Sequence, residues 1–364
     1  MSSLYVKTPL LRRAFGKPNI QISKVPQFLV KYEFFQPSGS FKSRGIGNLI
    51  YNKVSEIRRD PAKQPHVFSS SGGNAGLAAA TASQRMGIPC TVVVPTSTRQ
   101  RIIEKIMATG ATIICRGDYF AEADSYLKDL MQEAANKNTR DKKNVPIYVH
   151  PFNHPLIWHG HSYIVEEILE SLRNENIPYS RVKGIVCSVG GGGLYNGIIE
   201  GLERHSLANT IPIIGVETEG CEVLHKSLIA GKLITFKKAL SVATSLSVPT
   251  ITKETLRYAQ KYKTKSLVLG EGEVLDTCLR FTDESNIVTE PACGATLHLG
   301  YHPAILHKEL GPLSSEDIVI LIACGGSATT LADLRELKLK YNPVTLDDSP
   351  VEIPGLITEQ VLTA

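Results

Sequence analysis

The sequence predicts an α/β protein built on parallel sheets that helices cover on both faces, and three observations carry that prediction. Short apolar runs of strand length alternate with longer helical patterns over most of the 364 residues. The run at residues 318–324 is apolar throughout and that at 90–94 is mostly β-branched, as strands are when both faces of a sheet are covered. Turns rich in glycine or serine follow several runs, as expected where a strand passes into a helix.

Each element follows from its local pattern. The predicted strands are β-branched or apolar runs that end at turn residues, and they cover 66–69, 90–94, 112–115, 147–150, 184–189, 213–216, 266–269 and 318–324. The predicted helices have helical periodicity or small residues, and they cover 75–86, 99–109, 120–135, 194–204, 254–262, 273–284, 295–309 and 328–340. The pattern indicates further parts of the fold at 5–11 and 27–35, turns around Pro151 and Pro155, a charged surface loop at 136–145, and a C-terminal tail at 344–364.

The composition excludes several classes of protein. Hydrophobic residues make up 42% and charged residues 21%, which is typical of a globular chain, and the net charge is only +5. No dense basic stripe with interleaved aromatic residues is present, so nucleic acid is not an expected partner. No apolar run reaches the roughly 18–20 residues of a membrane span. The seven cysteines form no C-x-x-C pair and indicate reduced thiols in an intracellular protein.

The N-terminal segment leaves two compartments open. Residues 1–32 contain six basic residues and no acidic one, as transit peptides do. The fold-like segments at 5–11 and 27–35 overlap any cleavable leader of that length. We therefore expect a cytoplasmic protein, with a mitochondrial location as the alternative.

The strongest physical signal for a ligand is the run of four glycines at residues 190–193. It follows a predicted buried strand and precedes a helix that begins at Leu194. Without side chains, successive backbone N–H groups can converge on one anion in front of a helix N-terminus. The loop lacks the G-x-G-x-x-G order of dinucleotide folds and the lysine of a P-loop. It predicts a phosphate site of another kind, with a flexible turn as the alternative.

Three further turns carry polar or nucleophilic groups. Lys42 follows the candidate N-cap Ser40, and the positive end of a helix favours the neutral, nucleophilic amine there, although a lone lysine at a helix start is usually just solvated. The segment SSSGGNAG at 69–76 offers hydroxyls, N–H groups and the Asn74 amide to a carboxylate, or forms a capped turn. Cys324 ends a predicted strand, where a buried core thiol is the simpler interpretation.

Together these motifs resemble the fold-type II pyridoxal-phosphate enzymes of the serine/threonine dehydratase family. P-S-G-S-F-K-S-R-G, S-S-G-G-N-A-G, S-V-G-G-G-G-L, E-P-A-C-G-A and A-C-G-G-S occur in the family's order between about residues 8 and 337. The chain looks most like the short eukaryotic catabolic L-serine dehydratases that also accept L-threonine. The resemblance implies the tryptophan synthase β-like architecture, with two doubly wound parallel-sheet domains and the active site between them. A large domain would comprise 1–45 and 151–343, and a small inserted domain 46–150.

The resemblance also implies roles for single residues. Lys42 would form the Schiff base with pyridoxal 5′-phosphate, and Phe41 would pack against its pyridine ring. The phosphate would bind at Gly190, Gly191, Gly192, Gly193 and Leu194, the phenolic oxygen at Asn74 and the pyridine nitrogen at Cys324. The substrate carboxylate would bind at Ser71, Gly72, Gly73 and Asn74. A potassium ion would bind at Gly190, Glu217, Cys221, Val223, Leu246 and Val248. We interpret E-P-A-C-G-A as a packing motif without chemistry.

The implied activity is β-elimination of water from L-serine to pyruvate and ammonia, and conversion of L-threonine to 2-oxobutanoate and ammonia. This implies a small amino-acid substrate, a role in amino-acid catabolism and gluconeogenesis, and a homodimer. A serine racemase and a β-replacement synthase of the same fold are the alternatives. Serine racemases carry a serine where this chain has Gly72. Because Gly72 has no hydroxyl to protonate the far face of the substrate, we predict little racemisation and open space for the methyl group of threonine.

Overall fold

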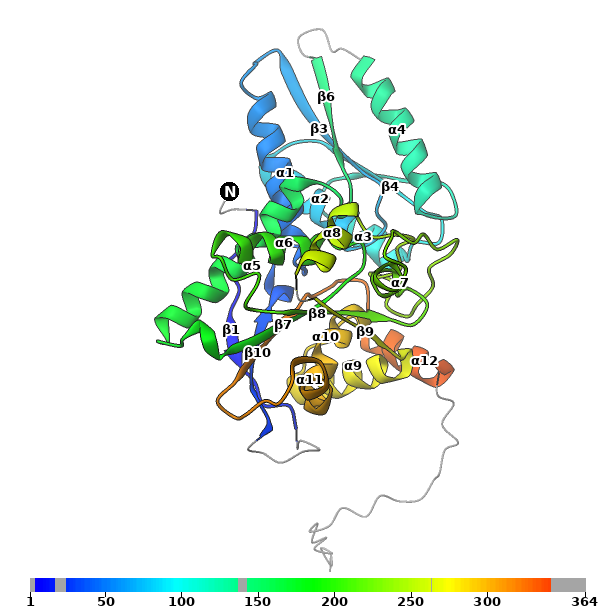
Figure 1. Cartoon of the computed structure of the whole chain (residues 1–364). Helices are drawn as coiled ribbons and strands as arrows, with labels where there is room; N and C mark the ends of the chain where they lie inside the picture. Colours follow the sequence, from blue (N-terminus) through cyan, green and yellow to red (C-terminus); the bar gives the residue numbers. More distant parts are fainter. Residues whose placement is uncertain (1–3, 17–23, 137–142, 263, 342–364) are drawn as a thin grey trace, which may run out of the picture.

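The computed structural model describes residues 4–16, 24–136, 143–262 and 264–341 and confirms the α/β architecture (Figure 1). The described strands form two sheets. The larger has the order β1 (Leu10–Arg12), β2 (Gln27–Tyr32), β10 (Ile318–Ala323), β7 (Val182–Ser188), β8 (Ile213–Thr218), β9 (Lys265–Leu269). The smaller has the order β5 (Thr112–Cys115), β4 (Cys90–Val94), β3 (Lys63–Ser69), β6 (Lys143–Val149). All neighbouring strands pair in parallel except β1, which runs antiparallel to β2.

Helices cover both sheets. The small sheet packs against α1 (Lys42–Ile57), α2 (Asn74–Met86), α3 (Gln100–Met107) and α4 (Phe120–Asn136). The large sheet is accompanied by α5 (Pro155–Asn174), α6 (Gly193–Arg204), α7 (Val223–Ala230), α8 (Lys253–Lys261), α9 (Glu271–Ser285), α10 (Pro291–Tyr301), α11 (Pro303–Leu310) and α12 (Leu331–Tyr341). Short 3-10 helices are η2 (Glu33–Phe35) and η3 (Tyr179–Arg181). We call the small sheet with α1–α4 the small lobe and the remainder the large lobe.

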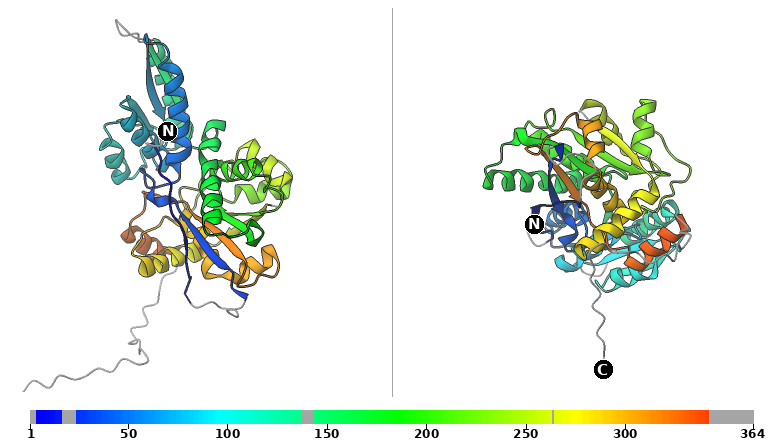
Figure 2. Two further views of the ribbon diagram at one scale, coloured as in Figure 1. Left: turned by 90° about the vertical axis from the view of Figure 1, so that its left-hand side faces the viewer. Right: turned by 90° about the horizontal axis from the view of Figure 1, so that it is seen from below.

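The two lobes are visible in the left view of Figure 2, where α1 and the cyan segments lie above the green to orange ones. The strands of the small sheet all come from residues 63–149, within the predicted small domain. The domain boundaries at residues 45/46 and 150/151 remain predictions. Helix α1 joins the lobes, because it packs on α2 of the small lobe and on α5 of the large lobe.

A glycine lets α1 and α5 approach closely. A Cβ atom on Gly160 of α5 would lie 2.5 Å from the carbonyl oxygen of Arg44 in α1, a distance at which only glycine fits.

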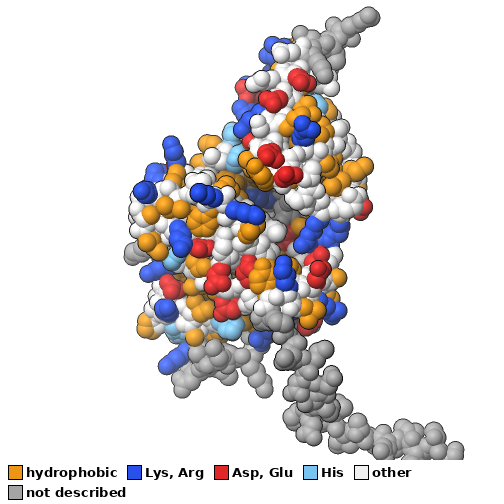
Figure 3. All heavy atoms as spheres, turned by 90° about the vertical axis from the view of Figure 1, so that its right-hand side faces the viewer, with side chains coloured by type: hydrophobic (Ala, Val, Ile, Leu, Met, Phe, Trp, Pro, Cys, Tyr) orange, Lys and Arg blue, Asp and Glu red, His pale blue; other side chains and the backbone are white. Residues whose placement is uncertain are grey.

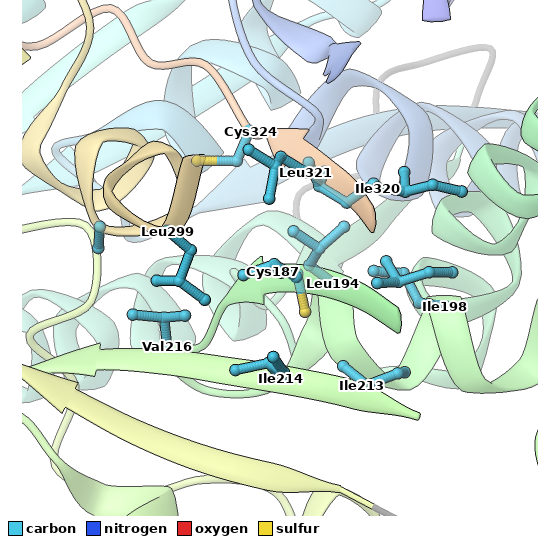
Figure 4. Packing of buried hydrophobic residues seen from close by; sticks show 14 of the residues in the cluster. Cys187, Leu194, Ile198, Ile213, Ile214, Val216, Leu299, Ile320, Leu321 and Cys324 are labelled. Atoms are coloured by element: carbon cyan, nitrogen blue, oxygen red, sulfur yellow. The ribbon is translucent and has the colours of Figure 1, made fainter. Parts of the chain in front are cut away.

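The core of the large lobe is centred on the large sheet. All six residues of β10 are buried, which explains why its sequence is apolar without alternation. Figure 4 shows the packing of Leu194 and Ile198 of α6 over β7 and β8.

The strand order selects the loops where a ligand can bind. In the large sheet, β7, β8 and β9 follow one another outward, whereas β10 lies on the other side of β7. In the small sheet, the order reverses in the same way between β3 and β6. Ligands of open α/β sheets bind beyond the carboxyl ends of strands at such reversals. The loops that leave these four strands are residues 189–192, 324–330, 70–73 and 150–154.

Three expectations for local structure are wrong. Pro155 does not break the chain into turns, because it occupies the first turn of α5, where a missing N–H is tolerated and His154 caps the helix. The single helix expected at 295–309 is two helices, α10 and α11, because Pro303 starts the second. The expected surface loop overlaps α4 and β6 at its two ends. Its middle, residues 137–142, and the expected tail at 344–364 lie outside the described residues.

The surface agrees with the modest net charge. Acidic, basic and apolar side chains are interspersed on the face seen in Figure 3. Within the part of the chain that the structure describes, no helix has both the length and the apolar character needed to cross a membrane.

Candidate active site

The loop of glycines between β7 and α6 is shaped by its neighbours. Gly192 has a φ of +92°, in the left-handed region, and a Cβ atom on it would lie 1.9 Å from Thr255 Oγ1. A Cβ on Gly191 would lie 2.3 Å from the ring of Phe152, so glycine is required at both positions. The loop presents backbone N–H groups that donate to no described residue, those of Gly190, Gly191, Gly192, Gly193 and Leu194. Because buried N–H groups are almost always paired, this row of donors at a helix N-terminus fits a phosphate.

Lys42, the first residue of α1, is linked to the glycine loop through residues 151–152. Its Nζ donates a hydrogen bond to the carbonyl oxygen of Pro151 at 2.6 Å, and Phe152 packs on Gly191. Burial penalises the ammonium form and lowers the pKa of Lys42 to about 8. A lysine with such a pKa is partly neutral near neutral pH, and the neutral amine is a nucleophile.

The segment that carries Lys42 is fastened to the loop after β10. The backbone N–H of Phe41 donates to Cys324 O at 3.0 Å, and that of Gly326 donates to Gly39 O at 2.8 Å. The Phe41 ring packs on His161 with a centroid separation of 4.8 Å. His161 is buried with no hydrogen-bond partner for either ring nitrogen among the described residues, and burial lowers its pKa well below the ordinary value. The neutral imidazole ring of His161 therefore packs against the Phe41 ring.

The amide of Asn74, at the start of α2, is held from both sides. Its Nδ2 donates to Glu290 Oε2 at 2.9 Å and to Ser245 Oγ at 3.3 Å, and its Oδ1 accepts from the N–H of Ser327 at 2.9 Å. Both Nδ2 hydrogens are thus engaged. The predicted bond from Asn74 to a cofactor oxygen would have to replace one of them, and the longer bond to Ser245 is the weaker one.

The loop between β3 and α2 presents free donors of the kind that a carboxylate needs. The N–H of Gly73 donates to Ser71 Oγ at 3.3 Å, whereas the N–H groups of Ser71, Gly72 and Asn74 donate to no described residue. They lie at the N-terminus of α2, which favours a negative charge. This arrangement supports the predicted carboxylate site.

Thr98 fills the space that a side chain on residue 72 would occupy, and the expected room for the methyl group of threonine stays a prediction. A Cβ atom on Gly72 would lie 2.2 Å from Thr98 Oγ1 and 2.9 Å from Thr98 Cγ2, because the segment before α3 folds against this loop. The Thr98 hydroxyl makes no hydrogen bond with any described residue. A hydroxyl therefore lies on this side of the loop although residue 72 has none.

Cys324 directly follows β10 and carries a buried thiol. Figure 4 shows its sulfur directed toward α10, and Ser188 Oγ donates to it at 3.6 Å. The pKa of Cys324 is raised well above its ordinary value, mainly by a hydrogen bond with Cys293 of α10 and secondly by burial. The thiol is therefore neutral, and its predicted contact with a pyridine nitrogen remains a prediction.

Glu217, the predicted acidic ligand of a cation, makes hydrogen bonds that stabilise the start of α7. Its carboxylate accepts from the N–H groups of Leu224 and His225 at 2.7 and 2.8 Å and so caps α7, while burial raises its pKa to about 7. The Leu246 carbonyl accepts from Val248 N at 2.8 Å and lies close to Gly190. Among the described residues, no three His, Cys, Asp or Glu side chains form a metal-binding group, so carbonyl oxygens are the main donors left for the predicted ion.

Sequence reasoning missed several residues that shape this region. Glu290 was interpreted as packing, yet its buried carboxylate accepts from Asn74, Ser245 and Ala328. An acidic residue inside an otherwise small and apolar segment was an available signal, because a buried carboxylate needs partners. Thr98 and Phe152 had no comparable signal, because their contacts with Gly72 and Gly191 depend on how loops that are distant in sequence meet.

The assembled geometry fits pyridoxal phosphate. The junction of the lobes combines buried N–H donors for a phosphate, an amine with lowered pKa, an aromatic ring beside that amine, and a second set of N–H donors for a carboxylate. The Lys42 amine lies 5.0 Å from the centroid of the Phe41 ring, so the flat surface and the nucleophile are adjacent.

Comparisons with known proteins agree with this geometry. Residues 1–325 match the model of the family described as pyridoxal-phosphate dependent enzyme. The chain is 54% identical to the catabolic L-serine/threonine dehydratase of Saccharomyces cerevisiae over 94% of each chain. It is 50% identical to an L-serine dehydratase of the same species, over 93% of this chain and 98% of the relative. Among solved structures, a fungal L-serine ammonia-lyase from Rhizomucor miehei is 32% identical, with a TM-score of 0.80 over 93% of this chain and 99% of that one.

Proposed function

The chain belongs to the family of pyridoxal-phosphate dependent enzymes, and from that premise we propose that it is a lyase that eliminates water from L-serine. The products are pyruvate and ammonia, and L-threonine gives 2-oxobutanoate and ammonia. The observation that carries the proposal is the partly buried Lys42 amine, held at the carbonyl oxygen of Pro151 near a phosphate cradle, in a chain 54% identical to a catabolic L-serine/threonine dehydratase. The neighbouring carboxylate loop supplies the site for an amino-acid substrate.

Bound pyridoxal phosphate supplies an aldehyde that reacts with amines and a conjugated ring that spreads the electron pair left by a departing α-proton. The residues of the chain do the rest by position. The N–H groups of residues 190–194 hold the phosphate, and Phe41 supports the ring. The loop at Ser71–Asn74 holds the substrate carboxylate, which orients the α-hydrogen. Lys42 Nζ, in its neutral form, takes that proton.

Cys324 favours elimination over reactions that need a long-lived carbanion. Its pKa is raised well above the ordinary value by Cys293 and by burial, so the thiol stays neutral beside the place that the resemblance gives to the pyridine nitrogen. A neutral thiol stabilises a protonated ring less than a carboxylate does. A neutral thiol at this position would leave a bound ring a weaker electron sink, which favours prompt loss of the β-hydroxyl.

An assay of products tests the proposal. Purified protein with cofactor is given pure L-serine, and pyruvate, ammonia and D-serine are measured together. We expect equal amounts of pyruvate and ammonia, and 2-oxobutanoate from L-threonine. D-serine without pyruvate would identify a racemase. Product that forms only when a second nucleophile is added would identify a β-replacement synthase.

We also propose a bound potassium ion, a homodimer and a cytoplasmic location. The ion is supported by the approach of the Leu246 carbonyl to Gly190 near the buried Glu217. The dimer is supported by the exposed apolar side chains of Val6 and Phe35, which lie on either side of a hydrogen bond from Val6 N to Gln36. The location is supported by β1, since removal of residues 1–32 as a leader would delete two paired strands. Titration with potassium, light scattering and cell fractionation test the three in turn.

A further inference from the structure

Glu290 occupies an unusual position for an acidic residue. It precedes Pro291 at the start of α10 but makes no hydrogen bond that caps this helix. Only 3% of its surface is exposed, so its carboxylate must be paired within the protein. The hydrogen-bond partners of this carboxylate therefore indicate its role.

The partners of Glu290 come from three separate segments. Oε2 accepts from Asn74 Nδ2 at 2.9 Å and from Ser245 Oγ at 2.6 Å, and Oε1 accepts from the N–H of Ala328 at 2.7 Å. Asn74 begins α2 in the small lobe, Ser245 lies between α7 and α8, and Ala328 follows β10. One carboxylate therefore joins the small lobe to two loops of the large lobe.

The Glu290 carboxylate is connected both to the loop before α2, which we call the carboxylate loop (residues 70–73), and to the glycine loop, which we call the phosphate loop (residues 190–193). Asn74 ends the loop that presents N–H donors for a carboxylate, and its Oδ1 also accepts from Ser327 N. On the other side, a Cβ atom on Gly190 of the phosphate loop would lie 3.3 Å from the Ser245 carbonyl oxygen. The space around Glu290 is closed, since a Cβ on Gly326 would lie 2.0 Å from its carboxyl carbon.

We propose that Glu290 is a positioning residue of the elimination, which holds the start of α2 against the large lobe and so sets the separation of the carboxylate loop from the phosphate loop. This inference rests on the proposed function. Lys105 of α3 assists from the small lobe, because its Nζ donates to Ser327 O at 2.9 Å.

Glu290→Gln tests the role while preserving shape. A carboxamide has one accepting oxygen, so either Ala328 N or the pair of Asn74 and Ser245 loses its acceptor. Loss of one hydrogen bond to a charged group corresponds to about a tenfold change in an equilibrium constant. We therefore expect KM for L-serine to rise about tenfold, while kcat changes less than about threefold. Hydrogen exchange in a peptide that spans residues 70–80 should become faster, without substrate present.

Two further variants separate positioning from folding. Ser245→Ala keeps the carboxylate and removes one donor, and in a double-mutant cycle it should have little additional effect on KM in the Glu290→Gln background. Glu273→Gln is the matched control, because this glutamate also lies at a helix start, where it accepts from Gly270 N at 2.9 Å, but contacts neither ligand loop. It should lower Tm without changing KM.

The outcomes distinguish this inference from the proposed function. Faster exchange at 70–80 together with a raised KM supports the inference. Unchanged exchange and KM in Glu290→Gln, with only the Tm loss seen for Glu273→Gln, would overturn it. If the wild-type protein forms no pyruvate, the proposed function fails, and the exchange measurement still decides whether Glu290 holds the start of α2.

Discussion

Arg44 allows a demanding prediction about how the nucleophile is held in place. It lies two residues after Lys42 in the first turn of α1 and is fully buried. Its guanidinium donates to Glu33 at 2.7 and 2.8 Å and to Glu167 at 2.6 and 2.7 Å. Lys31 donates to Glu167 at 2.6 Å, so two cations balance two anions within the core.

The effect of Arg44→Lys follows from counting these bonds. Lysine keeps the charge, but its single nitrogen cannot form two-pronged pairs with both carboxylates. At least two of the four charged hydrogen bonds to Glu33 and Glu167 are then lost. Each is worth about 1.5–3 kcal/mol, so the free energy of unfolding should fall by about 3–6 kcal/mol. Breaking a buried ion pair in other proteins has a similar effect, about 3–5 kcal/mol.

Urea and thermal unfolding of the cofactor-loaded protein measure this change, and the cofactor absorbance reports on Lys42 at the same time. Arg204→Lys is the matched control, because Arg204 donates to Glu166 at 2.8 and 3.0 Å between two neighbouring helices but is partly exposed. Its loss should be about 0–1 kcal/mol. Similar losses in the two variants would refute the reasoning, since burial would then not determine the strength of the pair.

Four further predictions concern the site. Lys42→Ala should abolish turnover while cofactor still binds at residues 190–194, and equilibrium dialysis that shows no binding would contradict the cradle. Because burial lowers the pKa of Lys42 to about 8, the neutral amine dominates above that pH; the rate of cofactor capture by the cofactor-free protein should rise with pH, reach half its maximum near pH 8 and level off about one unit higher, whereas an ordinary lysine would show a rise to beyond 10. Gly72→Ala should collide with Thr98, lower the free energy of unfolding by about 1–3 kcal/mol and weaken activity, and adding Thr98→Ala should restore much of both; a fully stable and active single variant would show that the loop moves freely. Potassium should activate more than sodium, and Glu217→Gln should reduce that difference; equal rates in both salts across a titration would count against the ion.

The sequence alone determined most of the strands, many of the helices and the chemical groups of the site, but not α5 and α7. β10 is covered on both faces and is apolar throughout, and β4 and the middle of β7 are rich in β-branched or apolar residues, so these strands could be predicted from residues that lie next to each other. The four glycines of residues 190–193 and Lys42 were identifiable for a similar reason, since a phosphate cradle and a helix-start amine each depend on a few consecutive residues. Resemblance of several such motifs in order then connected them to one cofactor.

The tertiary structure alone decided which of these groups meet and what supports them. Asn74 and Glu290 are 216 positions apart, and Asn74 and Ser327 are 253 apart, yet each pair shares a hydrogen bond. These contacts exist because β10, late in the chain, pairs with β2 and β7, which brings the loop at 324–328 to the start of α1 and α2. A local apolar pattern is the same for any order of strands in a sheet, so it carries no information about which loops become neighbours. For the same reason, the buried charges around Arg44 and the contact of Thr98 with Gly72 emerged only once the strands and helices had been placed in three dimensions.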